Sequence, residues 1–438
     1  MDTIFAPICP LGGSIVSVRF SGENAFELLN FFGVNQDKYK DTNLFFTTLK
    51  YKNEVIDEVV VKIFKKPHSF TGENVVEVDL HASRIILKRF LELSSKIPNF
   101  RFAKNGDFTR RAFLNGKVDL IKSEGINAII RAETEQQYKI ANEMFYGNIK
   151  KQYQEIRNKL IEAMSYVETQ IDFSEEEIPD EIVKNVKTIT ASLIEKISQC
   201  LQDKKAIDKI NQGVSVAIIG KPNTGKSSLL NFLAKRDIAI VSPIAGTTRD
   251  ILNVDVEING YKATFYDTAG IRDTDDLIES EGVNRAKNIA KNADICIFMC
   301  DNVEDYIETK NENKDKDNVI FVINKLDERK ENIKDIEENC IELSVLNQIN
   351  LDVLIEKIGD KILKQVELKQ NPLVFNERHA VLLKNCIECL ERIDFDTMPI
   401  EIIGEELRCA IDCIGQITGQ IYTDDILDVV FSKFCIGK

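Results

Sequence analysis

The sequence predicts a multidomain protein that combines α+β and α/β folds: an N-terminal α+β domain, a discontinuous helical domain, and an inserted α/β domain with a doubly wound sheet. Three styles of sequence support this prediction. Residues 1–117 contain short β-type runs separated by Gly, Pro and Asn, residues 118–210 and 368–438 show a 3.6-residue apolar period, and residues 211–367 alternate strand and helix patterns. Because both ends of the inserted region adjoin helical segments, we interpret the two helical parts as one domain.

The elements within these regions follow from local patterns. In the N-terminal region, β-type runs bounded by turn residues predict strands at 14–20, 55–64 and 75–80. Residues 135–171 contain almost no Gly or Pro, apart from Gly147, and predict long helices. Residues 301–317 are strongly charged, so we expect a mobile surface loop there.

Composition bounds the class of protein. A length of 438 residues corresponds to about three domains of roughly 150 residues. No apolar run approaches the roughly 20 residues that span a membrane, and the N-terminus lacks a signal-peptide pattern, so we expect a cytoplasmic protein without a membrane partner. The net charge of -14 gives no overall basic surface for nucleic acid.

The chain contains ten cysteines, which we expect to be reduced. Cys386 with Cys389, and Cys409 with Cys413, approach a four-thiolate zinc pattern. Residues three or four apart also share one face of a helix, and both pairs fall in helical patterns. We therefore favour packing in a core over metal binding.

A phosphate-binding loop is predicted at residues 220–227, which read GKPNTGKS. The apolar run 214–219 predicts a buried strand before the loop, and an apolar helical pattern follows it. Backbone N–H groups in such a loop converge on phosphates. We expect Lys226 to meet the β- and γ-phosphates and Ser227 to ligate Mg²⁺.

The nucleotide base is predicted from a second strand, 318–323, which is followed by Asn324, Lys325, Leu326 and Asp327. The Asp327 carboxylate can accept two hydrogen bonds from guanine, whereas adenine offers no such pair of donors. The segment 342–345 resembles the fifth GTPase box, although Val345 stands where alanine is usual.

Two switch segments are expected between these motifs. Asp267, Thr268, Ala269 and Gly270 follow a strand at 263–266, so that Asp267 can hold Mg²⁺ through water and Gly270 can approach the γ-phosphate. The other segment, 245–250, offers Thr248 as a second hydroxyl on the ion. We expect the γ-phosphate to order both segments.

The motifs do not by themselves identify the catalytic group. Many GTPases place a glutamine where this chain has Ile271, and an alkyl side chain cannot orient water. Catalysis must come from an extra cation or from a carboxylate in residues 272–285. The candidate carboxylates are Asp273, Asp275, Asp276, Glu279 and Glu281.

Beyond these boxes, the chain resembles the MnmE/TrmE family of tRNA modification GTPases. The resemblance is carried by TIFAP at 3–7, SFTGE at 69–73, GDFTRRAFLNGK at 106–117, ITGQIYTDDI at 417–426 and FCIGK at 434–438. The GTPase boxes alone would fit many ribosome-assembly GTPases, but the RAFLNGK and CIGK segments would not.

The resemblance implies that 1–117 is a folate-binding and dimerisation domain, that 118–210 and 368–438 form the helical domain with a C-terminal CIGK tail, and that 211–367 is a Ras-like GTPase domain. It implies a homodimer that works with a flavin-dependent partner, as a heterotetramer, on the wobble uridine of certain tRNAs. The expected cofactors are GTP, Mg²⁺, K⁺ and 5-formyltetrahydrofolate or a related folate.

The resemblance also assigns residues. Those matching the folate contacts are Arg19, Glu77, Lys117 and Lys438. Cys435 is a candidate catalytic thiol, with a packing role as the alternative. Where relatives carry Gly-His-Gly-Gly, this chain has Leu80-His81-Ala82-Ser83, and its early glycine-rich turn is Leu11-Gly12-Gly13-Ser14.

In the GTPase domain, Glu279 matches a water-orienting carboxylate, and the positions matching K⁺ ligands are Asn223, Ser242, Ile244 and Thr247. The full set of expected GTP contacts is Asn223, Thr224, Gly225, Lys226, Ser227, Ser228, Ser242, Pro243, Ile244, Ala245, Gly246, Thr247, Thr248, Asp267, Thr268, Ala269, Gly270, Asn324, Lys325 and Asp327.

The sequence therefore favours a K⁺-activated GTPase that acts in tRNA wobble-uridine modification. Two alternatives remain: a GTPase switch whose output is binding to the ribosome or another RNA, and a folate-dependent one-carbon transferase in which GTP is only regulatory.

Overall fold

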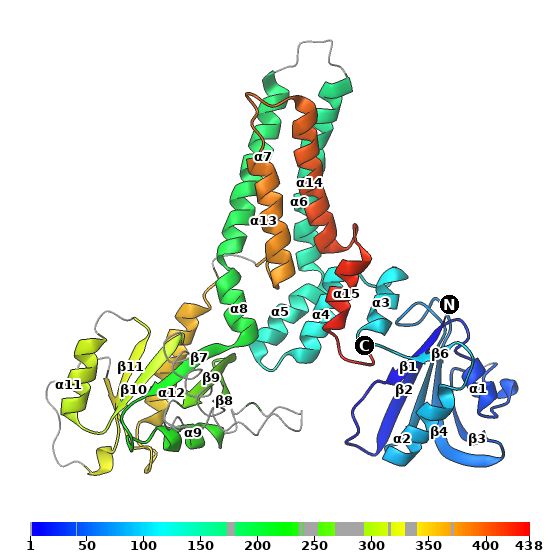
Figure 1. Ribbon diagram of the computed structural model, residues 1–438, viewed down its shortest axis with the longest axis horizontal. Coiled ribbons are helices and arrows are strands. Elements are labelled where there is room, and N and C mark those ends of the chain that lie inside the picture. Colours follow the sequence, from blue (N-terminus) through cyan, green and yellow to red (C-terminus); the bar gives the residue numbers. More distant parts are fainter. Residues whose placement is uncertain are drawn as a thin grey trace, which may run out of the picture. The chain divides into compact units, whose positions relative to one another are not determined.

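The structure is a computed structural model, and it describes residues 2–40, 42–172, 180–235, 240, 253–267, 293–313, 317–328, 340–368 and 372–438. The chain forms two compact units. The first comprises Met1–Asn127, Glu143–Asn158 and Ile411–Lys438, and the second comprises Ala128–Asn142 and Lys159–Ala410. The structure contains two six-stranded sheets and a set of long helices, so the predicted multidomain α+β and α/β fold class is confirmed (Figure 1).

The first unit contains a six-stranded sheet in the order β3-β4-β5-β2-β1-β6. Its strands are β1 (Thr3–Pro7), β2 (Ile15–Ser21), β3 (Leu44–Tyr51), β4 (Glu54–Phe64), β5 (Val75–His81) and β6 (Phe100–Phe102). Neighbouring strands are antiparallel except for β1 and β6. The strands predicted at 14–20, 55–64 and 75–80 correspond to β2, β4 and β5.

Alternation along β2 separates the two faces of this sheet. Val16, Val18 and Phe20 are buried in the core that also includes side chains of α1 (Glu27–Phe31) and α2 (Arg84–Ser94). The intervening Ser17 and Arg19 are only half buried and lie on the opposite face. One face of the sheet therefore forms the core, and the other carries polar side chains.

A second core in this unit joins residues far apart in the sequence. It contains Phe113 of α3 (Asp107–Leu114), Leu120 of α4 (Leu120–Arg131) and the apolar face of α15 (Asp424–Ser432). Gly106 has φ +71°, and a Cβ there would overlap the carbonyl oxygen of Phe431. Only glycine therefore allows the last helix to approach α3 so closely.

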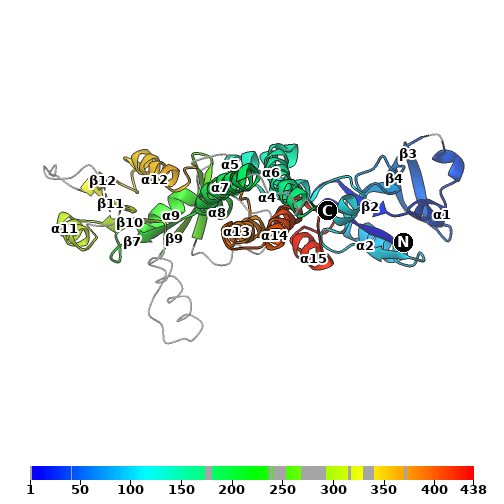
Figure 2. The ribbon, with the colours of Figure 1, turned by 90° about the horizontal axis from the view of Figure 1, so that it is seen from above.

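The remaining helices follow the predicted periodicity. The long helical region at 135–171 forms α5 (Glu135–Tyr146) and α6 (Asn148–Asp172), which are separated by Gly147 at φ +97°. The other helices of this region are α7 (Asp180–Gln202), α8 (Lys204–Gln212), α13 (Glu377–Glu391) and α14 (Ile400–Thr418). In the second unit, α13 packs against α7 (Figures 1 and 2).

The paired cysteines lie in these helices. Cys386 and Cys389 are buried on α13, and Cys413 is buried on α14, while Cys409 is half buried. Within the described parts of the chain, no group of three or more His, Cys, Asp or Glu side chains is arranged to hold a metal ion. Burial on helix faces accounts for the spacing that resembles a zinc motif.

The second unit contains the other six-stranded sheet, in the order β12-β11-β10-β7-β9-β8. Its strands are β7 (Val214–Ile219), β8 (Asn253–Ile258), β9 (Tyr261–Asp267), β10 (Ile295–Cys300), β11 (Val319–Ile323) and β12 (Cys340–Glu342). All neighbours are parallel except β8 and β9. Strand order reverses between β7 and β10, the place where such sheets bind ligands at the strands' carboxyl ends.

Helices cover both faces of this sheet. Val216 and Ile218 of β7 share a core with α9 (Lys226–Ala234) and α12 (Leu351–Gln365), whereas Ala217 belongs to a core with Tyr306 of α11 (Val303–Glu312). The chain segments that border this α/β region lie side by side, because the Asn211 side chain donates a hydrogen bond to the Phe375 carbonyl oxygen at 3.1 Å.

The expectation of a loop at 301–317 is wrong, because α11 occupies most of that segment. The Asn302 side chain caps the helix by accepting the N–H of Asp305. The carboxylates of Glu304 and Asp305 in the first turn stabilise the positive end of the helix dipole. Tyr306 is buried and packs against Phe321. The charges that suggested a loop are instead the exposed side of a capped amphipathic helix.

Among the described helices, none has the length and apolar character needed to cross a membrane.

Candidate functional site

The loop between β7 and α9 has the backbone geometry of a phosphate cradle. Asn223 and Gly225 have φ of +66° and +100°, and Gly225 precedes the first residue of α9. A Cβ on Gly220 would overlap the carbonyl oxygen of Met299, and one on Gly225 would overlap the Asn324 amide. These glycines let the loop pack on β10 and on the segment after β11 while the amino end of α9 stays open to an anion.

Lys226 lies inside this loop with only 4% of its surface exposed. Its Nζ donates to the carbonyl oxygens of Gly220 and Lys221 at 2.8 and 2.6 Å. Burial lowers the pKa of Lys226, and the negative charge of Asp267 opposes that shift. The ammonium is thus held in the cradle by the loop's own carbonyl groups.

Two oxygen donors meet beside the cradle. Ser227 is in the first turn of α9, Asp267 is the last residue of β9, and the serine Oγ donates to Asp267 Oδ2 at 2.7 Å. Their approach follows from the register of the sheet, in which Asp267 pairs with Ile218 of β7. A hydroxyl and a carboxylate are ligands that Mg²⁺ prefers.

Asn324 ties this cradle to the loop after β12. Its Nδ2 donates to the Thr224 carbonyl oxygen at 2.8 Å, and its Oδ1 accepts the N–H of Val345 at 3.1 Å. The side chain is almost fully buried. Asn324 therefore has a structural role between two loops that sequence reasoning, which assigned it to base reading, did not foresee.

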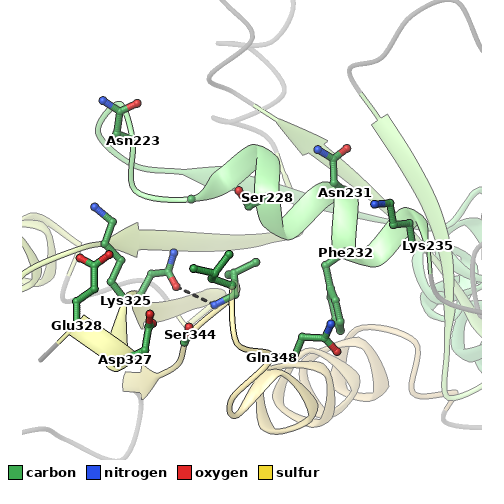
Figure 3. Close-up of a pocket in the computed structure, with 14 residues that line it drawn as sticks. Asn223, Ser228, Asn231, Phe232, Lys235, Lys325, Asp327, Glu328, Ser344 and Gln348 are labelled. Carbon is green, nitrogen blue, oxygen red and sulfur yellow. Dashed lines mark hydrogen bonds between the residues drawn. The ribbon is translucent and has the colours of Figure 1, made fainter.

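A cavity of about 480 Å³ lies between α9 and these loops. Figure 3 shows Asn223 and Ser228 on the side of the phosphate loop, with Lys325 and Asp327 opposite them. The remaining lining residues are Gly225, Asn231, Phe232, Lys235, Asn324, Glu328, Ser344, Val345, Leu346 and Gln348. The predicted phosphate and base motifs thus border one cavity.

Several of these lining residues were missed from sequence. Asn231 and Phe232 of α9 and its C-cap residue Lys235 follow Ser228 at intervals of three, four and seven, so they lie on the same side as Ser228. That periodicity is a signal the sequence does contain. Leu346 and Gln348 lie in an irregular turn, where no period indicates which side chains face the cavity.

Many predicted residues lie outside the described residues. They are Ser242, Pro243, Ile244, Ala245, Gly246, Thr247, Thr248, Thr268, Ala269, Gly270 and the candidate base Glu279, together with Asp273, Asp275, Asp276 and Glu281.

In the first unit, two of the predicted folate residues meet on neighbouring strands, and a third contacts the loop that follows β4. Arg19 and Glu77 are register partners on β2 and β5, and Arg19 Nε donates to Glu77 Oε1 at 2.8 Å. The guanidinium also lies against the rings of Phe70 and Phe108, at 5.5 and 5.6 Å from their centroids. Lys117 Nζ donates to the Pro67 carbonyl oxygen at 2.8 Å, in the same loop as Phe70.

The CIGK segment reaches the same sheet. A Cβ on Gly437 would overlap the carbonyl oxygen of Pro7 at the end of β1, and the Gly106 N–H donates to the Cys435 carbonyl oxygen at 3.5 Å. Cys435 is exposed. Lys438 directly follows Gly437, which lies against Pro7 of β1. β1 pairs with β2, the strand that carries Arg19.

A partly buried polar network, not foreseen from sequence, holds the loop that carries Phe70. Arg111 donates to Glu73 Oε2 at 3.0 Å and to Asp2 Oδ1 at 2.7 Å, and Ser21 Oγ donates to Glu73 Oε2 at 2.6 Å. The neighbouring Arg110 pairs with Asp424 and Asp428 of α15. Arg110 and Arg111 are thus both paired with carboxylates.

Comparison with known proteins identifies the family of this chain. A family model described as MnmE helical domain matches residues 120–435, and one described as GTP-binding protein TrmE N-terminus matches residues 3–117. The tRNA modification GTPases MnmE of Rickettsia canadensis (strain McKiel) and Rickettsia prowazekii (strain Madrid E) are each 39% identical, over 448 and 447 residues, and the matches cover 100% of both chains.

Among solved structures, the FeoB G-domain from Methanococcus jannaschii is 22% identical, with a TM-score of 0.26, over 34% of this chain and 97% of its own. The family assignment rests on the full-length sequence matches and the two family models instead. The chain belongs to the MnmE family of tRNA modification GTPases.

Proposed function

We propose that this protein binds and hydrolyses GTP in the cavity between α9 and the loops at 324–328 and 344–348, and that GTP turnover drives modification of C5 of the wobble uridine of certain tRNAs. The observation that carries the proposal is the continuity of the site. Asn223 of the phosphate loop and Asp327 of the base loop line one cavity, and Asn324 joins the two loops. The buried Lys226 and the adjacent Ser227 come directly after Gly225 of that lining, and Ser227 donates to Asp267. Family membership supplies the link to tRNA.

In this proposal, the phosphates lie over the amino end of α9, where backbone N–H groups and the Lys226 ammonium neutralise their charge. Ser227 and Asp267 fit Mg²⁺, with Thr248 as a further ligand, and the ion would supply charge neutralisation at the β- and γ-phosphate oxygens. The Asp327 carboxylate accepts hydrogen bonds from guanine, and Lys325 borders the same part of the cavity.

Hydrolysis is proposed to depend on K⁺. Asn223, with Ser242, Ile244 and Thr247, would hold the ion, which adds positive charge next to the phosphates. The position of Asn223 at the rim of the cavity, with φ +66°, supports this assignment. Glu279 is proposed to orient the attacking water, since Ile271 cannot.

Arg19, Glu77, Lys117 and Lys438 are proposed to bind 5-formyltetrahydrofolate or a related folate as the one-carbon donor. The Arg19–Glu77 pair fits such a ligand, because a guanidinium has five N–H donors and can bind a second group while it holds Glu77. The rings beside Arg19 offer an apolar wall. Cys435, exposed near this region, is proposed as the thiol that takes part in the uridine chemistry.

Family membership also supports the proposed organisation. We propose a folate-binding and dimerisation domain at 1–117, a helical domain at 118–210 and 368–438, and the GTPase domain at 211–367. The working form is a cytoplasmic homodimer that joins a flavin-dependent partner in a heterotetramer.

A modified-nucleoside analysis of tRNA from a deletion strain tests the proposal. The C5-modified wobble uridine should disappear and should return with the wild-type gene but not with Lys226→Ala. Unchanged nucleosides in the deletion strain would indicate an RNA-binding switch instead. Restoration by a Lys226→Ala protein that is shown not to hydrolyse GTP would indicate a one-carbon transferase with regulatory GTP.

A further inference from the structure

The amino ends of two strands that lead to the proposed nucleotide site are both held by one corner of the helical region. This α4–α5 corner comprises residues 132–137, the connection after α4 and the first turn of α5. The Gln137 side chain donates to the carbonyl oxygens of Ile210 and Asn211 at 3.2 and 3.0 Å, just before β7 begins. Its contact lies opposite the phosphate loop, at the other end of β7.

The same corner holds the start of β9. The Gln136 N–H donates to the Gly260 carbonyl oxygen at 3.1 Å in the turn between β8 and β9. Gly260 has φ +83°, and a Cβ there would lie 3.4 Å from Gln136 Cγ, at the limit of ordinary contact. The turn and the first turn of α5 therefore lie against each other without a gap.

A three-charge bridge reinforces this contact. Lys262 Nζ lies 2.8 Å from Glu133 Oε2 of the corner and 2.8 Å from Asp255 Oδ2 of β8. Only 15% of the lysine side chain is exposed. Burial lowers the pKa of Lys262, but its hydrogen bonds to Asp255 and Glu133 outweigh that effect and raise it, so the lysine stays charged. Without this ammonium, two carboxylates would face each other across the contact.

The far end of β9 is Asp267, which accepts the Ser227 hydroxyl in the proposed Mg²⁺ site. Lys262 and Asp267 are five residue steps apart on one continuous strand, about 17 Å at the usual rise of a strand. A strand that is hydrogen-bonded on both sides moves as a unit, and β9 pairs with β7 and with β8. A displacement of Asp267 along the strand would therefore also displace Lys262.

We propose that β9 transmits the nucleotide state of the site to the helical region, with Lys262 as the positioning residue that couples β8 and β9 to the α4–α5 corner. This inference rests on the proposed GTP binding. A coupling of this kind requires the two nucleotides to favour different arrangements of the contact, and typical couplings correspond to about 5- to 150-fold in an equilibrium constant.

The test compares amide hydrogen exchange of α5 in the full-length protein with GDP and with the non-hydrolysable β,γ-imido analogue of GTP. In the wild type, we expect exchange rates in α5 to differ by about fivefold or more between the nucleotides. In Lys262→Met, the difference should fall below about twofold while affinity for both nucleotides, measured by calorimetry, shows that the protein is folded. Lys262→Arg should retain the difference.

Lys204→Met is the matched control. Lys204 also bridges two carboxylates, Asp208 at 2.8 Å and Glu377 at 2.7 Å, but these lie on α8 and α13 and not on β8 or β9. It should keep the wild-type difference. Glu133→Gln, at a half-exposed position, provides a second variant in which the difference should also shrink.

The outcomes separate the two proposals. If the wild type binds neither nucleotide, the proposed function is wrong and the coupling fails with it. If both nucleotides bind but α5 exchanges alike with each, or if Lys262→Met keeps the full difference, the coupling alone is overturned.

Discussion

Replacing Asn324 by alanine tests whether the nucleotide site is held together as the structure indicates. The substitution removes two hydrogen bonds, to the Thr224 carbonyl oxygen and from the Val345 N–H. Each buried polar group left without a partner costs about 1–3 kcal/mol. In the variant without nucleotide, the two loops can separate so that water satisfies the unpaired groups. A nucleotide that brings the loops together again removes this water, so the free-energy cost appears as weaker nucleotide binding.

Taking the lower part of that range, about 2–3 kcal/mol for both groups, the dissociation constant should rise about 30- to 150-fold. The losses for GDP and GTP should be equal, because Asn324 joins the base loop to the phosphate loop and does not distinguish the γ-phosphate. Isothermal titration calorimetry with both nucleotides measures this directly.

Asn158→Ala is the control, because Asn158 is an exposed asparagine on α6 that does not line the cavity. Its affinity should stay within about twofold of the wild type, as for most surface substitutions. Wild-type affinity in Asn324→Ala, or a loss confined to GTP, would refute the role assigned to this side chain.

Three further predictions concern catalysis and the one-carbon site. GTP turnover should be at least about tenfold faster in K⁺ than in Na⁺ at matched ionic strength, since a K⁺ ion at Asn223 replaces part of an arginine finger's effect; equal rates would exclude that ion. Glu279→Ala should lower kcat about 10²- to 10⁴-fold with little change in nucleotide affinity, and losses of that size only in Asp275→Ala or Asp276→Ala would move the role there. Removing Cys435 to Lys438 should abolish uridine modification and weaken formyl-tetrahydrofolate binding while K⁺-stimulated hydrolysis persists; a truncated protein that still restores the modification would contradict the folate assignment.

Features that depend on neighbouring residues could be predicted from the sequence, whereas contacts between distant residues could not. Strands such as β7 and β11 were predicted within a residue, because a buried parallel strand is apolar along its whole length. The glycines of the phosphate loop were likewise identified, since a backbone with positive φ limits the choice of residue. These are local signals.

Long-range polar contacts left no local signal. Arg111 pairs with Asp2 and Glu73, and Lys262 pairs with Glu133, at separations of 109, 38 and 129 residues. A charged side chain has the same local pattern whether it is solvated or buried with a partner. For the same reason the sequence predicts a loop where α11 forms, because the many charges of this segment mask its cap and its buried Tyr306.

The most direct test of the central claim is the nucleotide preference of Asp327→Asn. If Asp327 reads guanine in the cavity of Figure 3, an asparagine there should favour xanthine, whose 2-oxo group accepts a hydrogen bond where guanine's 2-amino group donates one. Measured with purified protein, kcat/KM should favour GTP over XTP in the wild type and XTP over GTP in the variant. The same preference for GTP in both proteins would contradict the claim that GTP is bound and hydrolysed at this site.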